Sequence, residues 1–92
     1  MRIKTDADLA KWVAETPKVK SLNLYGTQVV DLSPLAGLTN LKALDLCDTQ
    51  VVDLSPLAGL TNLEVLDLCD TQVDQQSLDN LRAALPNVRI YR

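Results

Sequence analysis

The chain has 92 residues, of which 47% are hydrophobic and 23% are charged, a length that holds one domain with a barely sufficient core and excludes a second domain. This composition excludes intrinsic disorder, and no apolar run approaches the ~18–20 residues that a membrane-spanning helix needs. The formal net charge of −3 argues against a nucleic acid or a membrane surface as partner, because phosphates select basic surfaces.

The first predicted element is an N-terminal capping helix near residues 6–15, within a cap that spans residues 1–18. Thr5 followed by Asp8 resembles a capping box. The following turns carry an apolar stripe formed by Leu9, Trp12 and Val13. We therefore expect Trp12 to pack in the cap rather than to bind a ligand. The start of the chain has no apolar run of the kind found in a secretory signal.

An internal repeat with a period of 22 residues follows the cap. Residues 22–43 and 44–65 are identical at 17 of 22 positions, and a third copy starts at Leu66 before it diverges. A proline interrupts each full copy, which excludes one long helix. The near-identity of the copies indicates either a recent duplication or a repeat idealised by design.

Each copy divides into a strand and a turn. Leu44-Asp45-Leu46 alternates with period two, which is typical of a short strand. In the segment 55–59, serine suits the N-cap, proline the first helical position and glycine a left-handed exit, so a 3₁₀ or single helical turn is predicted. Coils of residues 19–73 stacked about 4.8 Å apart would bury their leucines together. The expected columns are Leu22, Leu44 and Leu66, and Leu24, Leu46 and Leu68.

Residues 74–92 are predicted to form a C-terminal cap. Asp74 can cap a helix, after which Pro86-Asn87 turns the chain into a last strand over Val88–Tyr91. The inward-facing residues of this helix are expected to be Leu78, Leu81 and Leu85. The sequence leaves open which of Val88, Ile90 and Tyr91 faces the core.

The pattern Leu41-x-x-Leu44-x-Leu46-x-x-Thr49-x-Val51 resembles the leucine-rich repeat, specifically the 22-residue class of the internalins and of a regulatory subunit of protein phosphatase 1. The resemblance implies one α/β solenoid domain over residues 1–92. Its short parallel sheet would line the concave face, 3₁₀ or single helical turns the convex face, and helical caps both ends. Many family members have asparagine where this chain has Thr27, Thr49 and Thr71. A threonine hydroxyl can still bond to the backbone at the inner corner.

The resemblance also implies protein recognition through the concave strands. Between residues 31 and 79 there are nine acidic residues and one basic residue, Lys42, so a protein or peptide partner is predicted, preferably a basic one, with Tyr25 as aromatic anchor. Alternatively, the aspartates are copies without a purpose. The candidate binding residues are Asn23, Tyr25, Asp45, Cys47, Asp48, Asp67, Cys69 and Asp70.

The two cysteines, Cys47 and Cys69, are one repeat apart and are expected to stack about 5 Å apart, within disulfide range. In-register parallel neighbours seldom offer the required Cβ geometry, so free thiols and a cytoplasmic location are predicted. Two thiolates beside aspartates form an alternative hypothesis, a site for a soft divalent metal. No histidine assists and the spacing is that of the repeat itself, so no metal or cofactor is assigned.

Catalysis has little support, because the sequence contains no histidine, no glycine-rich phosphate loop and no partnered nucleophile. We predict a non-catalytic scaffold. The competing hypothesis is a designed or idealised repeat scaffold that has no natural partner and self-assembles. The last strand, Val88–Tyr91, has no obvious cover, so a homodimer through this edge is a further expectation, opposed by Arg89 and Arg92.

Overall fold

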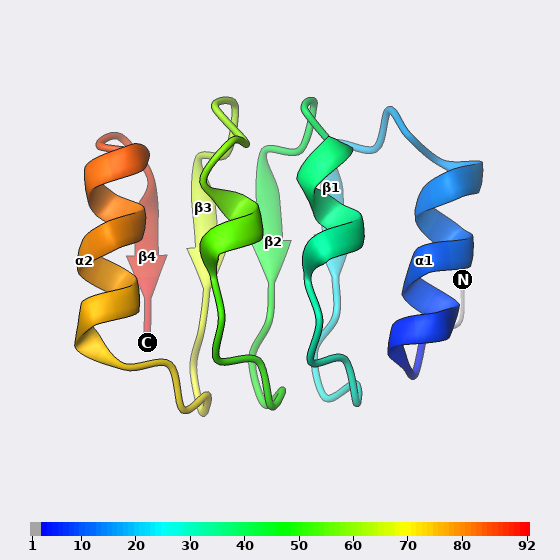
Figure 1. Ribbon diagram of the computed structural model, residues 1–92, viewed down its shortest axis with the longest axis horizontal. Helices are drawn as coiled ribbons and strands as arrows, with labels where there is room; N and C mark the ends of the chain where they lie inside the picture. Colours follow the sequence, from blue (N-terminus) through cyan, green and yellow to red (C-terminus); the bar gives the residue numbers. More distant parts are fainter. Residues whose placement is uncertain (1–2) are drawn as a thin grey trace.

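A parallel sheet and a row of helices and helical turns form the two layers of the molecule (Figure 1). The computed structural model describes residues 3–92, so Met1 and Arg2 of the predicted N-terminal cap lie outside the described residues. The strands lie side by side in chain order, β1-β2-β3-β4. The elements are α1 (Asp6–Glu15), β1 (Ser21–Asn23), the 3₁₀ turn η1 (Ser33–Gly37), β2 (Ala43–Asp45), the 3₁₀ turn η2 (Ser55–Leu57), β3 (Val65–Asp67), α2 (Gln75–Ala84) and β4 (Arg89–Tyr91).

The register of the sheet stacks equivalent residues of successive coils, because each strand pairs with the next in parallel. One column of partners consists of Leu22, Leu44, Leu66 and Ile90. The second predicted column, Leu24, Leu46 and Leu68, is also buried. Val88 and Ile90 pack partly buried against the core, whereas Tyr91 is 53% exposed. The last strand therefore continues the first leucine column with an isoleucine.

Both capping helices form where the sequence predicts them. The Thr5 hydroxyl accepts a hydrogen bond from the N–H of Asp8, and the Asp74 carboxylate accepts one from the N–H of Ser77 over 2.8 Å. Leu9 is fully buried in α1. Trp12 and Val13 are partly buried against the same core. The leucines of α2 and its C-cap are buried within it, namely Leu78, Leu81 and Leu85. The two helices close the ends of the leucine columns.

The convex turns start differently from the prediction, which placed a serine at the N-cap. In η1 and η2 the serine is the first residue of the turn, and no N-cap side chain bonds to either turn. Instead, the N–H of Ser33 donates to the Asp31 carboxylate over 2.9 Å, and the N–H of Ser55 donates to Asp53 over 3.0 Å. An aspartate two residues before each serine therefore closes the turn.

The left-handed backbone positions are also not those predicted. Gly37 and Gly59 have no positive φ, whereas Gly26 has a φ of 69°. The equivalent residues of the next two copies, Asp48 and Asp70, have φ values of 57° and 56°. The sharp corner of each coil thus follows the strand rather than the convex turn.

The threonines bond to the backbone at this inner corner, as expected. Each hydroxyl donates to the carbonyl oxygen of the leucine three residues earlier, over 2.9 Å for Thr27, 2.8 Å for Thr49 and 2.7 Å for Thr71. Thr49 is only 5% exposed, so its bond satisfies a buried hydroxyl.

No helix within residues 3–92 is long and apolar enough to cross a lipid bilayer.

Candidate functional site

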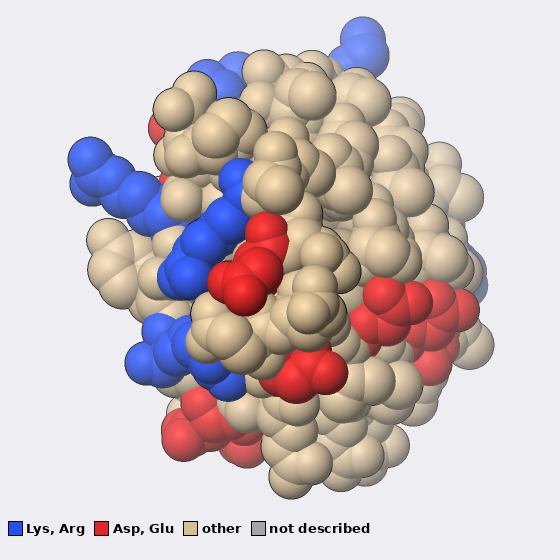
Figure 2. Space-filling view, turned by 60° about the vertical axis from the view of Figure 1, so that its left-hand side comes forward, with Lys and Arg blue, Asp and Glu red and all other residues tan. Residues whose placement is uncertain are grey.

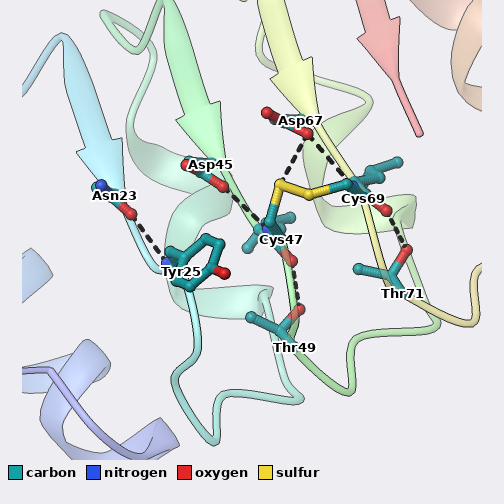
Figure 3. The surroundings of a disulfide bond; sticks show 10 residues. Asn23, Tyr25, Asp45, Cys47, Thr49, Asp67, Cys69 and Thr71 are labelled. Carbon is teal, nitrogen blue, oxygen red and sulfur yellow. Dashed lines mark hydrogen bonds between the residues drawn. A yellow bond between two sulfur atoms is a disulfide. The ribbon is translucent and has the colours of Figure 1, made fainter.

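A row of Asn and Asp side chains ends the first three strands, where Asn23, Asp45 and Asp67 lie in register. Each side-chain oxygen accepts a hydrogen bond from the backbone N–H two residues later, over 2.9, 2.9 and 3.3 Å respectively. Figure 3 shows these repeated turns side by side. The row therefore has a structural role in closing each strand end. The spacing of an Asn or Asp two residues before the donor is the signal that could have revealed it.

The next row contains Tyr25, Cys47 and Cys69, the donors of those three bonds. Cys47 and Cys69 form a disulfide with a Cα–Cα distance of 4.6 Å, so the prediction of free thiols is wrong. Both cysteines lie two residues beyond the ends of β2 and β3. Hydrogen bonds between the coils continue past the strand ends, where the N–H of Asp48 donates to the carbonyl oxygen of Cys69 over 2.9 Å. The two Cα atoms are therefore held within the range that a disulfide needs. The disulfide removes the argument from free thiols for a cytoplasmic location.

Asp67 lies beside this disulfide. Its Oδ1 atom is 2.7 Å from Cys47 Sγ and also accepts the backbone bond of Cys69 (Figure 3). A disulfide sulfur carries no hydrogen, whereas a thiol at the same position would donate one to this oxygen. Cys47, Asp67 and Cys69 each offer one potential metal-ligand atom, and these atoms lie within 4.8 Å of one another. Within residues 3–92 no other group of three such side chains comes together.

Tyr25 occupies the position of the two cysteines in the first copy and forms no covalent bond there. Its side chain is 60% exposed. Asp45 and Asp67 are half-buried, whereas Asn23 is exposed. The structure therefore brings the predicted residues of two successive rows together on one face, with the aromatic ring at the β1 end and the disulfide across β2 and β3.

The predicted residues Asp48 and Asp70 lie apart from these rows, at the corner of the coils. They line a groove of about 670 Å³. The same groove is lined by the recurring glutamines Gln28, Gln50 and Gln72, none of which was among the predicted site residues. Their recurrence in every copy, although they face solvent, is the signal that could have found them.

Charge is unevenly distributed on the end of the molecule that carries α2 and β4. Figure 2 shows Lys and Arg gathered along one flank, some Asp and Glu beside them, and a further acidic group toward the opposite side. Most of the surface between these groups is uncharged. A charged partner would therefore meet distinct patches.

Known proteins resemble this chain in sequence and in structure. The family model described as leucine-rich repeats (2 copies) matches residues 17–59 and again residues 39–83. An internalin (InlF) of Listeria monocytogenes superposes with a TM-score of 0.73 and 31% identity over 97% of this chain and 24% of that chain. Internalin C2 of the same organism gives a TM-score of 0.69 and 38% identity over 85% of this chain and 43% of that chain. The Chaetomium Mex67:Mtr2 subunits share the fold, with a TM-score of 0.62 and 21% identity over 89% of this chain and 57% of that chain.

The chain thus spans less than half the length of either internalin. No curated protein sequence matches it. The family model, the 22-residue period and the parallel sheet of stacked coils agree with one another. The chain belongs to the leucine-rich-repeat family.

Proposed function

We propose that this chain is a non-catalytic recognition module that binds a basic loop or peptide across the ends of β1–β3. The observation that carries the proposal is the exposed Tyr25 ring beside the in-register row that contains Asp45 and Asp67. Aromatic side chains are frequent anchors at interfaces, and a row of like charges steers an oppositely charged partner. Leucine-rich repeats are typically interaction modules, which fits this use of the surface.

The aspartates can serve a partner while they close their own turns. The backbone bonds of Cys47 and Cys69 use Oδ1 of Asp45 and Asp67. Each carboxylate therefore offers its second oxygen to a Lys or Arg of the partner. Charge-assisted hydrogen bonds of this kind are stronger than neutral ones.

The test is selection of binders from a displayed peptide library, followed by affinity measurements with the double variant Asp45→Asn/Asp67→Asn. Asn23 already makes the same turn in the first coil, so asparagine should preserve the strand ends and remove only the charge. We expect the selected peptides to be rich in Lys and Arg, and their affinity to fall in the double variant and in Tyr25→Ser.

The matched control is Asp31→Asn/Asp53→Asn, which removes the same amount of charge from the convex turns, where asparagine can also accept the serine N–H bonds. We expect this control to bind as the parent protein does. If both double variants lost affinity for the peptides equally, the net charge of the protein would explain the binding and the proposed surface would be wrong. A library that yields no specific peptide would favour the competing hypothesis, a scaffold without a natural partner.

A further inference from the structure

We propose that, once its disulfide is reduced, the protein binds one soft divalent cation such as Zn²⁺ through Cys47, Asp67 and Cys69. This site goes beyond peptide recognition, because it assigns a bound metal ion to the turns that follow β2 and β3. Two sulfur ligands and one carboxylate form a donor set that zinc accepts, with a water molecule completing the tetrahedron.

The distances among the three side chains suit such a site. Zinc bonds of about 2.3 Å to sulfur and about 2.0–2.2 Å to oxygen set ligand–ligand separations of about 3.4–3.8 Å in a tetrahedron. The three potential ligand atoms already lie within 4.8 Å of one another. The Cα atoms of Cys47 and Cys69 are 4.6 Å apart, so side-chain rotation can bring the two sulfur atoms to the tetrahedral separation once the bond between them is broken.

The turns that carry the ligands are held in place by their own hydrogen bonds. The N–H of Cys69 donates to Asp67 Oδ1 over 3.3 Å, and the N–H of Cys47 donates to Asp45 Oδ1 over 2.9 Å. Outer hydrogen bonds of this kind orient metal ligands before the ion arrives. Asp67 Oδ1 lies 2.7 Å from Cys47 Sγ, so in the reduced protein this oxygen can accept the proton of the thiol. A cation bound by both atoms would replace that proton.

Burial and charge favour a cation at this place. Cys47 is 2% exposed, and Asp67 and Cys69 are half-buried, so the ion would be partly shielded while one side stays open to water. Asp45 lies in register with Asp67 on β2, whereas Arg89 on β4 pairs with Val65, two residues before Asp67. The carboxylate of Asp45 therefore favours a cation from the β2 side of the site.

Oxidation and metal binding exclude each other, because both use the same sulfur atoms. A phosphine reductant supplies two electrons and is itself oxidised to the phosphine oxide with oxygen from water, while the two protons of that water convert the disulfide into two thiols. Zn²⁺ then displaces the proton of each thiol, so that two Zn–S bonds form and two protons are released. The oxidised protein has no thiolate to offer.

The experiment titrates Co²⁺ into the protein after reduction with a phosphine and removal of the reductant under anaerobic conditions. We expect one equivalent of Co²⁺ to produce the visible absorption of a tetrahedral thiolate site, and Zn²⁺ to abolish it by displacement. The disulfide form should give no absorption. Cys69→Ser should lose the signal, and Asp67→Asn should weaken binding.

Asp45→Asn is the matched control for Asp67→Asn. The two aspartates are equivalent in the repeat and close equivalent turns, but only Asp67 belongs to the proposed ligand set. We expect Asp45→Asn to retain the cobalt spectrum. Absence of the spectrum in the reduced parent protein, binding by the disulfide form, or equal losses in the two variants would overturn the proposal. Peptide binding by the oxidised protein is unaffected by any of these results.

Discussion

Single residues at the inner corner of each coil determine whether the chain can turn there. Gly26 has a φ of 69°, and a Cβ added to it would meet no atom within 4 Å. We therefore expect Gly26→Ala to destabilise the protein through backbone strain alone, by about 1–2 kcal/mol in the free energy of unfolding.

Gly37 also has open space around an added Cβ but no positive φ. Gly37→Ala should stabilise the protein by about 0.4–1 kcal/mol, because it restricts the unfolded chain.

Urea denaturation of the two variants and the parent protein measures both effects. Equal shifts in the two variants would contradict the assignment of the corner to Gly26. The left-handed position was predicted at Gly59, at the end of the convex turn, because a glycine after a short turn is a common exit. The actual signal was weaker: the corner positions in the other copies, Asp48 and Asp70, carry one of the few side chains that tolerate a left-handed backbone.

Hydrogen bonds to exposed carboxylates start three of the helical elements, and these bonds make the stability of the elements depend on pH. Each of these aspartates accepts hydrogen bonds from one serine: Asp31 from Ser33, Asp53 from Ser55 and Asp74 from Ser77. The bond from the backbone N–H, followed by the bond from the hydroxyl, lowers the pKa of each carboxyl group. A pKa that is lower in the folded state contributes stability above the ordinary Asp value of about 3.9, and this stability is lost as the pH falls through the folded values.

We therefore expect the free energy of unfolding to decrease as the pH is lowered through this range in a series of urea titrations. The triple variant Asp31→Asn/Asp53→Asn/Asp74→Asn keeps the acceptors and removes the titration, so its decrease should be shallower. Identical pH profiles for the variant and the parent protein would show that these bonds do not couple to folding.

The elements themselves differ in how far the sequence predicts them. The bounds of α1 and the cap of α2 follow from local patterns, because Thr5 and Asp74 each bond three residues ahead. The aspartates that close η1 and η2 were missed because the serine–proline pair offered a competing N-cap. The disulfide was missed because it depends on side-chain directions beyond the strand ends, which the 22-residue spacing does not contain.

The whole molecule has an open sheet edge at β4. Arg89 donates its N–H to Glu64 O over 2.8 Å, and Tyr91 O accepts from the N–H of Leu68 over 2.7 Å. Ile90, between them, therefore presents its backbone N–H and C=O away from β3, where a second copy can pair. We expect weak self-association through this edge, seen in sedimentation equilibrium as a mass that rises with protein concentration.

Ile90→Pro provides the check, because it removes the outward N–H and spares the bonds of Arg89 and Tyr91 to β3. This variant should stay monomeric at concentrations where the parent protein associates. A monomer mass for the parent protein at every concentration would remove the dimer. The arrangement of the whole molecule was the most predictable from the sequence, since the leucine columns follow from the repeat. The strength of pairing between two β4 edges, each three residues long, does not follow from the repeat.

The pairing between neighbouring coils is the same from β1 to β2 as from β2 to β3, with Leu22 opposite Leu44 and Leu44 opposite Leu66. A coil with the sequence of residues 44–65, inserted between residues 65 and 66, would meet the same leucine columns on each side, because the two full copies are identical at 17 of 22 positions. The protein can therefore grow by whole periods without inventing a new interface. Copying whole periods would move the two capping helices apart without a redesign of the contacts between coils.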